Sequence, residues 1–184
     1  MFFKQKLVDQ SVYIKKIPSS FLSIDYKKIE KEAMDSVKKK LTLNNNSFSP
    51  YKNYYTAKDN IHHIWVTDFV RDFFKIGLYE KATLVPHSTS YIVLNRGDDI
   101  SSHNHIDEYN IQGSPDFTAL LPIKSAENQF LEIEYGHGRK RQMKQRVPLI
   151  PEEVILFNAE LNHRFLINKE FQTTIILCSQ MKLI

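Results

Sequence analysis

The chain has 184 residues, of which 42% are hydrophobic and 25% are charged, and its formal net charge is +4. This length and composition support one globular domain with a substantial core, and they exclude a disordered or fibrous chain. No apolar run approaches about 18 residues, so no membrane span is predicted, and the N-terminus lacks the pattern of a signal peptide. Much of the positive excess lies in one run, residues 139–146, and not on a broad basic face with interleaved aromatics, which argues against a nucleic-acid partner.

The single cysteine, Cys178, has no partner for an internal disulfide. This predicts a reducing compartment, either the cytoplasm or a host cytoplasm if the chain is virus-encoded. Cys178 lies in the apolar stretch TTIILCSQM, so its side chain is predicted to pack in the core and not to act as a nucleophile.

The first part of the chain is predicted to contain a short strand followed by a helix. Apolar and polar residues alternate over residues 11–17, which predicts the strand. Residues 23–41 predict an amphipathic helix, and Ser23 or Asp25 is expected to cap its start. The apolar positions of this helix are Ile29, Ala33, Val37 and Leu41.

A second helix is predicted over residues 67–82, after a polar and aromatic loop at residues 43–55. Thr67 is the expected N-cap, and Trp65 and Phe69 are expected in the core. The apolar side of this helix contains Val70, Phe73 and Phe74.

From residue 83 onward, short β-rich runs alternate with turns. The predicted strands are residues 88–95, 116–124, 129–136, 145–150, 153–159, 163–168 and 172–181, with 101–107 as an additional candidate. This spacing is typical of a sandwich, jelly roll or barrel. The expected architecture is a single domain in which residues 1–82 form a helical cover and residues 83–184 form a double-stranded β-helix.

The stretch SSHNHIDEYN, residues 101–110, concentrates possible metal ligands. Side chains alternate between faces in an extended segment, so His103, His105 and Asp107 are expected on one face. The pair His105 and Asp107 supplies one imidazole and one carboxylate, which are two of the three ligands in a facial Fe(II) site.

The third ligand is expected to be His163. It follows a proline turn and a strand in PEEVILFNAELNH, and it opens the next apolar run. If His163 and His105 bind one ion, they must lie within about 6 Å of each other, because metal–nitrogen bonds are only about 2 Å long. The other histidines outside the motif, which lie in loops, turns or the approach to a strand, are His62, His63, His87 and His137.

The pattern H-x-D followed by PEEVILFNAELNH resembles the Fe(II)/2-oxoglutarate-dependent oxygenases over residues 88–181. That family has the double-stranded β-helix fold. The resemblance implies that His105, Asp107 and His163 bind iron. It further implies a dioxygenase that consumes 2-oxoglutarate and O2, yields succinate and CO2, and hydroxylates an unidentified substrate.

The resemblance also implies contacts to the cosubstrate. Many family members carry Arg or Lys about ten residues after the distal histidine, to bind the far carboxylate of 2-oxoglutarate. Here that place holds Thr173 and Thr174, so Lys124 is the alternative anchor and Arg146 a further candidate. The other predicted cosubstrate contacts are Tyr91, Thr118 and Thr174. The predicted substrate or secondary contacts are His103, Tyr109 and Arg146.

Two other interpretations stay open. Residues 97–113 approximate the first cupin motif, which would join His103, His105 and Glu108 to His163 in a metalloenzyme without 2-oxoglutarate. In an extended segment, however, Glu108 faces away from the two histidines. The third interpretation is a non-catalytic jelly-roll module that binds a sugar or another protein.

Two loops are candidates for the mouth of the site. The basic run RKRQMKQR, residues 139–146, is either a solvated hairpin loop or a flap that attracts an acidic small molecule or peptide. The aromatic segment at residues 48–55 either walls the same mouth or packs under a long loop.

Overall fold

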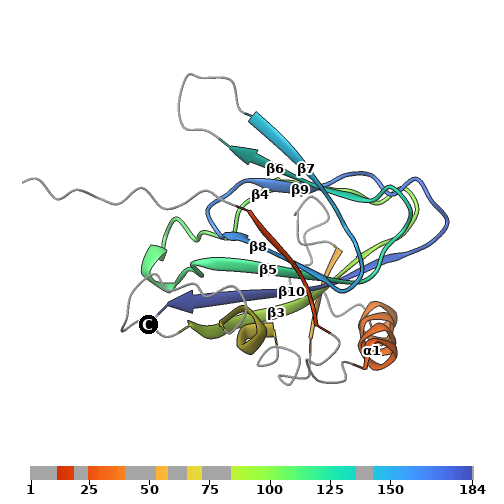
Figure 1. The fold of residues 1–184 in the computed structure, drawn as a ribbon, viewed down its shortest axis with the longest axis horizontal. Coiled ribbons are helices and arrows are strands. Elements are labelled where there is room, and N and C mark those ends of the chain that lie inside the picture. The colour runs from red at the N-terminus through yellow and green to blue at the C-terminus, as the bar shows by residue number, and fades with distance from the viewer. Residues whose placement is uncertain are drawn as a thin grey trace, which may run out of the picture.

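The computed structural model of the chain describes residues 12–18, 25–39, 53–57, 66–71, 84–135 and 143–183. Within these ranges the chain forms two antiparallel sheets that face each other, with the described helices on the outer side of the larger sheet (Figure 1). None of the helices in the described ranges is long and apolar enough to cross a membrane.

The larger sheet, called the major sheet, has the strand order β1-β8-β5-β10-β3-β2 within the described ranges. Its strands are β1 (Tyr13–Lys16), β2 (Tyr54–Thr56), β3 (Leu84–Leu94), β5 (Phe117–Lys124), β8 (Glu153–Asn158) and β10 (Thr174–Leu183). The smaller sheet, called the minor sheet, has the order β4-β9-β6-β7. Its strands are β4 (Ile100–His103), β6 (Phe130–Tyr135), β7 (Met143–Pro148) and β9 (His163–Phe165).

From β3 onward the chain passes back and forth between the two sheets. It runs from β3 in the major sheet to β4 in the minor sheet, then to β5, then to the hairpin β6–β7, then through β8 and β9 to β10. Each sheet therefore receives strands from both halves of this region. This is the topology of a double-stranded β-helix, which confirms the fold predicted from the strand spacing.

The alternation of side chains along β10 separates two apolar cores. Ile176 and Cys178 face the minor sheet and belong to the core between the sheets. Ile175 and Leu177 point the other way, into a core that the helices complete. Cys178 is fully buried as predicted, and burial raises the pKa of its thiol to about 12.

The first helix, α1 (Tyr26–Lys38), begins as its sequence predicts. The Asp25 side chain accepts a hydrogen bond from the Lys28 backbone N–H at 2.9 Å and caps the first turn. Ile29 and Ala33 are buried against the outer face of the major sheet. Val37 is partly buried on the same core, whereas Leu41 and Ser23 lie outside the described residues.

Residues 66–71 are helical, in the region where a second helix was predicted. Phe69 and Val70 are buried in the outer core, as expected. Thr67, the predicted N-cap, instead lies inside the helical segment, which already includes Val66. Trp65, Phe73 and Phe74 lie outside the described residues.

Residues 1–82, predicted as a helical cover with a strand over residues 11–17, contribute two strands to the major sheet. The predicted strand is present as β1 and pairs with β8, whereas β2 pairs with β3 and was not predicted. β2 overlaps the end of segment 43–55, which was interpreted as a loop. Its strand conformation depends on a partner almost forty residues away, with Tyr54 opposite Ile92, and local composition carries no signal for such a pairing.

The outer face of the minor sheet contains a buried carboxylate with three basic partners. Glu132 on β6 is 2% exposed and lies opposite Arg146 and Arg164 in the strand register. It accepts hydrogen bonds from Arg164 at 2.8 Å and from Arg146 and Lys144 at 3.3 Å each. Burial alone would raise the pKa of Glu132, but these hydrogen bonds lower it below its ordinary value of 4.5.

Glu132→Gln should therefore lower the free energy of unfolding by about 1–3 kcal/mol at neutral pH, because charge-assisted hydrogen bonds are lost. A lowered folded pKa stabilises the protein above the unfolded pKa, and this stabilisation disappears as pH falls through the folded pKa. The difference in the free energy of unfolding between wild type and variant should thus shrink as pH falls below 4.5. Urea denaturation at neutral pH and at a series of lower pH values measures it, with Glu127→Gln on the exposed β5–β6 turn as the control. A difference that does not depend on pH would contradict the ionic role of Glu132.

Candidate metal centre

Three histidines converge at one end of the space between the sheets. His103 ends β4, His105 follows two residues later, and His163 begins β9. Each offers one ring nitrogen, and these nitrogens lie within 4.8 Å of one another. The ring centroids are 4.4 Å apart for His103 and His163, 5.1 Å for His103 and His105, and 5.0 Å for His105 and His163. The separation expected for His105 and His163 is thus satisfied.

Backbone pairing places these three side chains. His103 lies directly opposite His163 in the antiparallel β4–β9 pair. The chain leaves the strand after His103, and the His105 N–H donates to the Ala159 carbonyl at 3.0 Å. That bond holds the segment against the end of β8, so the His105 ring points toward His103 and His163.

Two of the histidines have their tautomers fixed by backbone carbonyls. His163 Nδ1 lies 2.9 Å from the Leu161 oxygen, and His103 Nδ1 lies 2.9 Å from the Ser101 oxygen. A carbonyl oxygen only accepts hydrogen bonds, so Nδ1 carries the proton in both rings. Each Nε2 is left with the lone pair that a metal ion requires.

His105 is oriented by a glutamine from β10. Its Nδ1 lies 2.7 Å from Nε2 of Gln180, whose Oε1 accepts a 2.6 Å hydrogen bond from the Ser88 hydroxyl. Turning the Gln180 amide by half a rotation keeps both contacts, because a hydroxyl both donates and accepts. In that orientation Gln180 Oε1 accepts from Nδ1–H, and His105 Nε2 carries the lone pair as well.

Burial keeps the three imidazoles neutral. His163 is fully buried, and burial lowers its pKa well below 6.5, with the neighbouring His105 and His103 lowering it further. Burial and then His103 lower the pKa of His105 to about 3. Burial also lowers the pKa of His103. Neutral imidazole is the form that binds metal ions.

One nitrogen of this group requires a partner. His163 Nε2 is buried and has no hydrogen-bond partner among the described residues. Leaving a buried polar atom unsatisfied costs about 1–3 kcal/mol, and a metal ion bound by the group would remove that cost. The residues present therefore fit a metal ion held by three imidazoles, a ligand set suited to iron, zinc, copper or nickel.

Asp107, predicted as the carboxylate ligand, is not brought into this group. Its side chain is exposed and accepts a hydrogen bond from the Tyr109 N–H at 2.9 Å, while its own N–H donates to the Ser114 hydroxyl. The alternation that would align residues 103, 105 and 107 requires an extended chain, but β4 ends at His103 and a turn follows. The group therefore contains His103 in place of Asp107. Glu108 of the cupin-type pattern is exposed as well.

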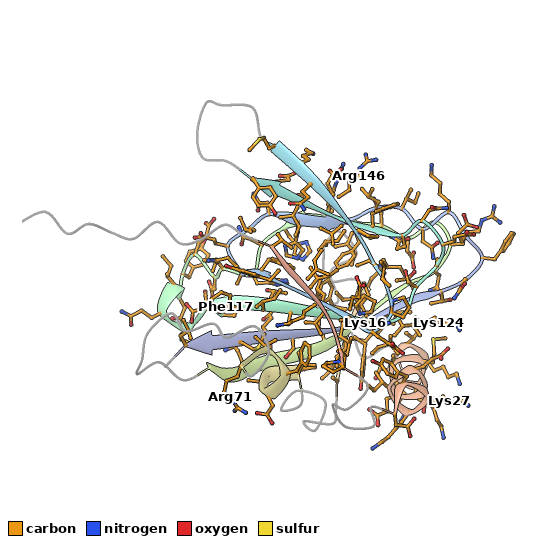
Figure 2. All side chains as sticks on the ribbon, in the orientation of Figure 1. Lys16, Lys27, Arg71, Phe117, Lys124 and Arg146 are labelled. Atoms are coloured by element: carbon orange, nitrogen blue, oxygen red, sulfur yellow. The ribbon has the colours of Figure 1, made fainter. Side chains whose placement is uncertain are left out.

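The predicted cationic anchors for 2-oxoglutarate are engaged elsewhere. Lys124 forms a 2.8 Å ion pair with Glu30 of α1, and Arg146 binds Glu132 on the outer face of the minor sheet. Figure 2 shows Lys124 beside α1 and Arg146 on β7, on opposite sides of the molecule.

The other predicted contacts divide into two groups. Three of them have side chains that lie elsewhere: the Tyr91 hydroxyl donates to Glu32 of α1, Tyr109 is fully exposed, and the Thr174 hydroxyl accepts from the Ala126 N–H. Thr118 differs, because it lies opposite both Gln180 and Phe157, which contact the histidine group. Its hydroxyl is buried without a hydrogen-bond partner among the described residues, beside the metal centre.

Two residues of the centre were missed by the sequence interpretation, Tyr54 and Gln180. The Tyr54 hydroxyl lies 3.0 Å from His103 Nε2. Gln180 carried a detectable signal, because it is a polar residue on the inward face of an otherwise apolar strand. Tyr54 carried none, since its position depends on the long-range pairing of β2 with β3.

A groove on the minor sheet is separate from this centre. It is lined by residues that include Ser101, Glu127, Arg146, Arg164 and Lys169. None of the three histidines lines it, and the charges that line it have both signs. The groove therefore does not identify the chemical site.

The ligand set can be tested with Co(II) as a probe for Fe(II). His103→Ala should weaken Co(II) binding by more than about 100-fold, because a ligand contributes more than the hydrogen bonds that support it. Asp107→Ala should leave the affinity unchanged and lower only the stability of its turn. Competition with a chromophoric chelator measures both. Loss of binding in Asp107→Ala and retention in His103→Ala would restore the H-x-D pair.

The stability of the metal-free protein should depend on pH through the same histidines. Their folded pKa values are depressed, so their contribution is complete above about pH 7 and declines as pH falls below 6.5, where only the unfolded chain binds protons. Three such groups give a slope of up to about 4 kcal/mol per pH unit. Urea denaturation with a chelator present measures this slope, and His163→Asn should reduce it by about a third. A flat profile would show that the imidazoles are protonated in the folded protein.

No protein-family model matches the sequence, and no curated protein matches it either. Solved structures do match. A prolyl-4-hydroxylase from Pseudomonas putida is 12% identical, with 96% of this chain and 94% of that chain covered and a TM-score of 0.63. A non-heme alpha-ketoglutarate-dependent carbocyclase from nogalamycin biosynthesis is 11% identical, with 94% and 79% covered and a TM-score of 0.62.

A viral collagen prolyl hydroxylase from Paramecium bursaria Chlorella virus-1, solved with 2-oxoglutarate, is also similar. It is 15% identical, with 92% of this chain and 95% of that chain covered and a TM-score of 0.57. The likeness extends over nearly the whole chain in each case. The chain therefore has the double-stranded β-helix fold that is found in these oxygenases.

Proposed function

We propose that this protein is an Fe(II)-dependent oxygenase that uses 2-oxoglutarate and O2 to hydroxylate an unidentified substrate. The observation that carries the proposal is the group of three neutral, buried imidazoles between the sheets of this fold. The solved structures with the same fold support it, since one is described as alpha-ketoglutarate-dependent and another was solved with 2-oxoglutarate.

His103, His105 and His163 would hold the iron in this proposal. Bound iron and 2-oxoglutarate supply the oxidising chemistry, in which O2 is reduced as 2-oxoglutarate is converted to succinate and CO2. The carbonyls of Ser101 and Leu161 and the Gln180 amide keep the three rings oriented.

The surroundings of the centre keep water away from it. Phe157 packs against His163 with ring centroids 4.8 Å apart, and it is fully buried. Leu161 and Phe165 continue the apolar wall between the sheets. The buried Thr118 hydroxyl offers a hydrogen-bonding group to an oxygen ligand on the same side of the centre.

A second candidate is a three-histidine metalloenzyme that does not use 2-oxoglutarate. The positions of the cations favour this candidate. Lys124 and Arg146 both form ion pairs elsewhere, and Thr173 and Thr174 occupy the position where the oxygenase family usually has a cation. No described cation faces the histidines to bind the far carboxylate of 2-oxoglutarate.

The proposal also covers the substrate class, the cellular location and the domain organisation. An acidic small molecule or a peptide is the proposed substrate class, supported by the net charge of +4. A cytoplasmic location is supported by the single buried thiol of Cys178. A single domain over residues 1–184 is supported by β1 and β2, which pair with β8 and β3 in the major sheet.

The proposal is tested by anaerobic titration of the apo-protein with Fe(II) and then with 2-oxoglutarate. A weak metal-to-ligand charge-transfer band should appear in the visible spectrum only when both are present. The band should be absent in His103→Ala and present in Asp107→Ala, which is the matched control.

Two other results would each reject the proposal. Stoichiometric Fe(II) binding without the band would establish the three-histidine metalloenzyme that does not use 2-oxoglutarate. Failure to bind Fe(II) at all would leave a jelly-roll binding module.

A further inference from the structure

Tyr54 brings a hydroxyl group to the metal-binding side of His103. It lies on β2, is 1% exposed, and places its oxygen 3.0 Å from His103 Nε2. Its ring meets His103 and His105 edge-on, with centroid distances of 5.8 and 6.3 Å. The phenol is therefore part of the wall that encloses the three histidines.

The hydrogen bond between Tyr54 and His103 cannot persist once a metal is bound. His103 Nδ1 already carries the ring proton, because it faces the Ser101 carbonyl. Its Nε2 consequently has one lone pair, which accepts the Tyr54 hydroxyl proton in the metal-free protein. A metal ion bound by His103 uses the same lone pair, so the hydroxyl must find another acceptor.

The phenol cannot move far when that happens. Its ring belongs to the core between the sheets, which also contains Ile92 and Ile100. Its backbone pairs with Ile92 of β3. The hydroxyl therefore stays beside the three histidines, within reach of an oxygen atom of a ligand on a bound metal.

We propose that Tyr54 is a positioning residue that transfers its hydrogen bond from His103 to an oxygen ligand bound at the metal. It opposes occupation by the metal alone and favours occupation by the metal together with an oxygen-donor ligand. This inference rests on the metal centre of the proposed function, and it does not require that the ligand be 2-oxoglutarate.

The expected effects of Tyr54 on the affinity for the metal and on the affinity for the oxygen donor have opposite signs. A purely structural role would change both affinities in the same direction. In Tyr54→Phe, Co(II) no longer has to displace a hydrogen bond, so its affinity should rise roughly threefold to tenfold. Acetohydroxamate, a bidentate oxygen donor, should bind the Co(II)-loaded variant roughly threefold to tenfold more weakly than the Co(II)-loaded wild type.

Both affinities are measured by the visible absorption of Co(II) in the full chain. Tyr55→Phe is the matched control. It removes a phenol hydroxyl from the next residue of the same strand, whose ring packs on the outer core, and it should change neither affinity.

Several results would overturn the proposal. Weaker Co(II) binding by Tyr54→Phe would make the phenol a metal ligand, and a change of both affinities in one direction would make it structural. Unchanged affinities would remove any role at the centre, and so would a wild type that does not bind Co(II). Wild-type Co(II)-protein that binds acetohydroxamate but not 2-oxoglutarate would reject the proposed cosubstrate alone, and the comparison of Tyr54→Phe with wild type would still decide the role of Tyr54.

Discussion

The antiparallel pairing of β4 with β9 is the constraint on which the metal centre depends. It places His103 directly opposite His163, at the point where both strands reach the same end of the minor sheet. Cross-strand neighbours in such a pair have Cβ atoms about 4.5–5.5 Å apart, close enough for two imidazoles to share an ion. A shift of the register by one residue would turn one ring to the outer face of the sheet. The fold therefore sets the geometry of two ligands before any metal arrives.

The predicted ligand set shows which features of the site can be inferred from sequence and which cannot. Strand spacing predicted the double-stranded β-helix, and the sequence flanking His163 brought that residue into the predicted ligand set, because both signals are local. The choice between His103 and Asp107 depended on whether the chain stays extended beyond residue 103. It does not, since the Asp107 carboxylate binds the Tyr109 N–H within a turn. Tyr54 could not be predicted from sequence for another reason, because its place at the centre depends on the pairing of β2 with β3, which is distant in sequence.

Burial leaves one imidazole of the candidate centre with an unsatisfied nitrogen. His163 is fully buried, its Nδ1 is committed to the Leu161 carbonyl, and its Nε2 has no hydrogen-bond partner among the described residues. The metal-free state is destabilised by that unsatisfied atom and by the mutual proximity of the three rings. A metal ion bound by the three histidines would satisfy that atom, so metal binding would be linked to folding.

The proposed oxygenase would depart twice from the pattern of the Fe(II)/2-oxoglutarate-dependent oxygenases, with His103 in place of Asp107 and with no cation at Thr173 or Thr174. These two departures would compensate each other in charge. With a His–Asp–His set, Fe(II) leaves one net positive charge at the centre, and a 2-oxoglutarate dianion needs one further cation for neutrality. With three neutral imidazoles, Fe(II) leaves two positive charges, which the dianion balances alone. An unbalanced charge between these sheets would be costly, because the surrounding core is apolar. In the proposed oxygenase, a ligand set with His103 in place of Asp107 would therefore need no cation at Thr173 or Thr174 for charge balance. A neutral donor such as the buried Thr118 hydroxyl would then be enough to orient an oxygen ligand.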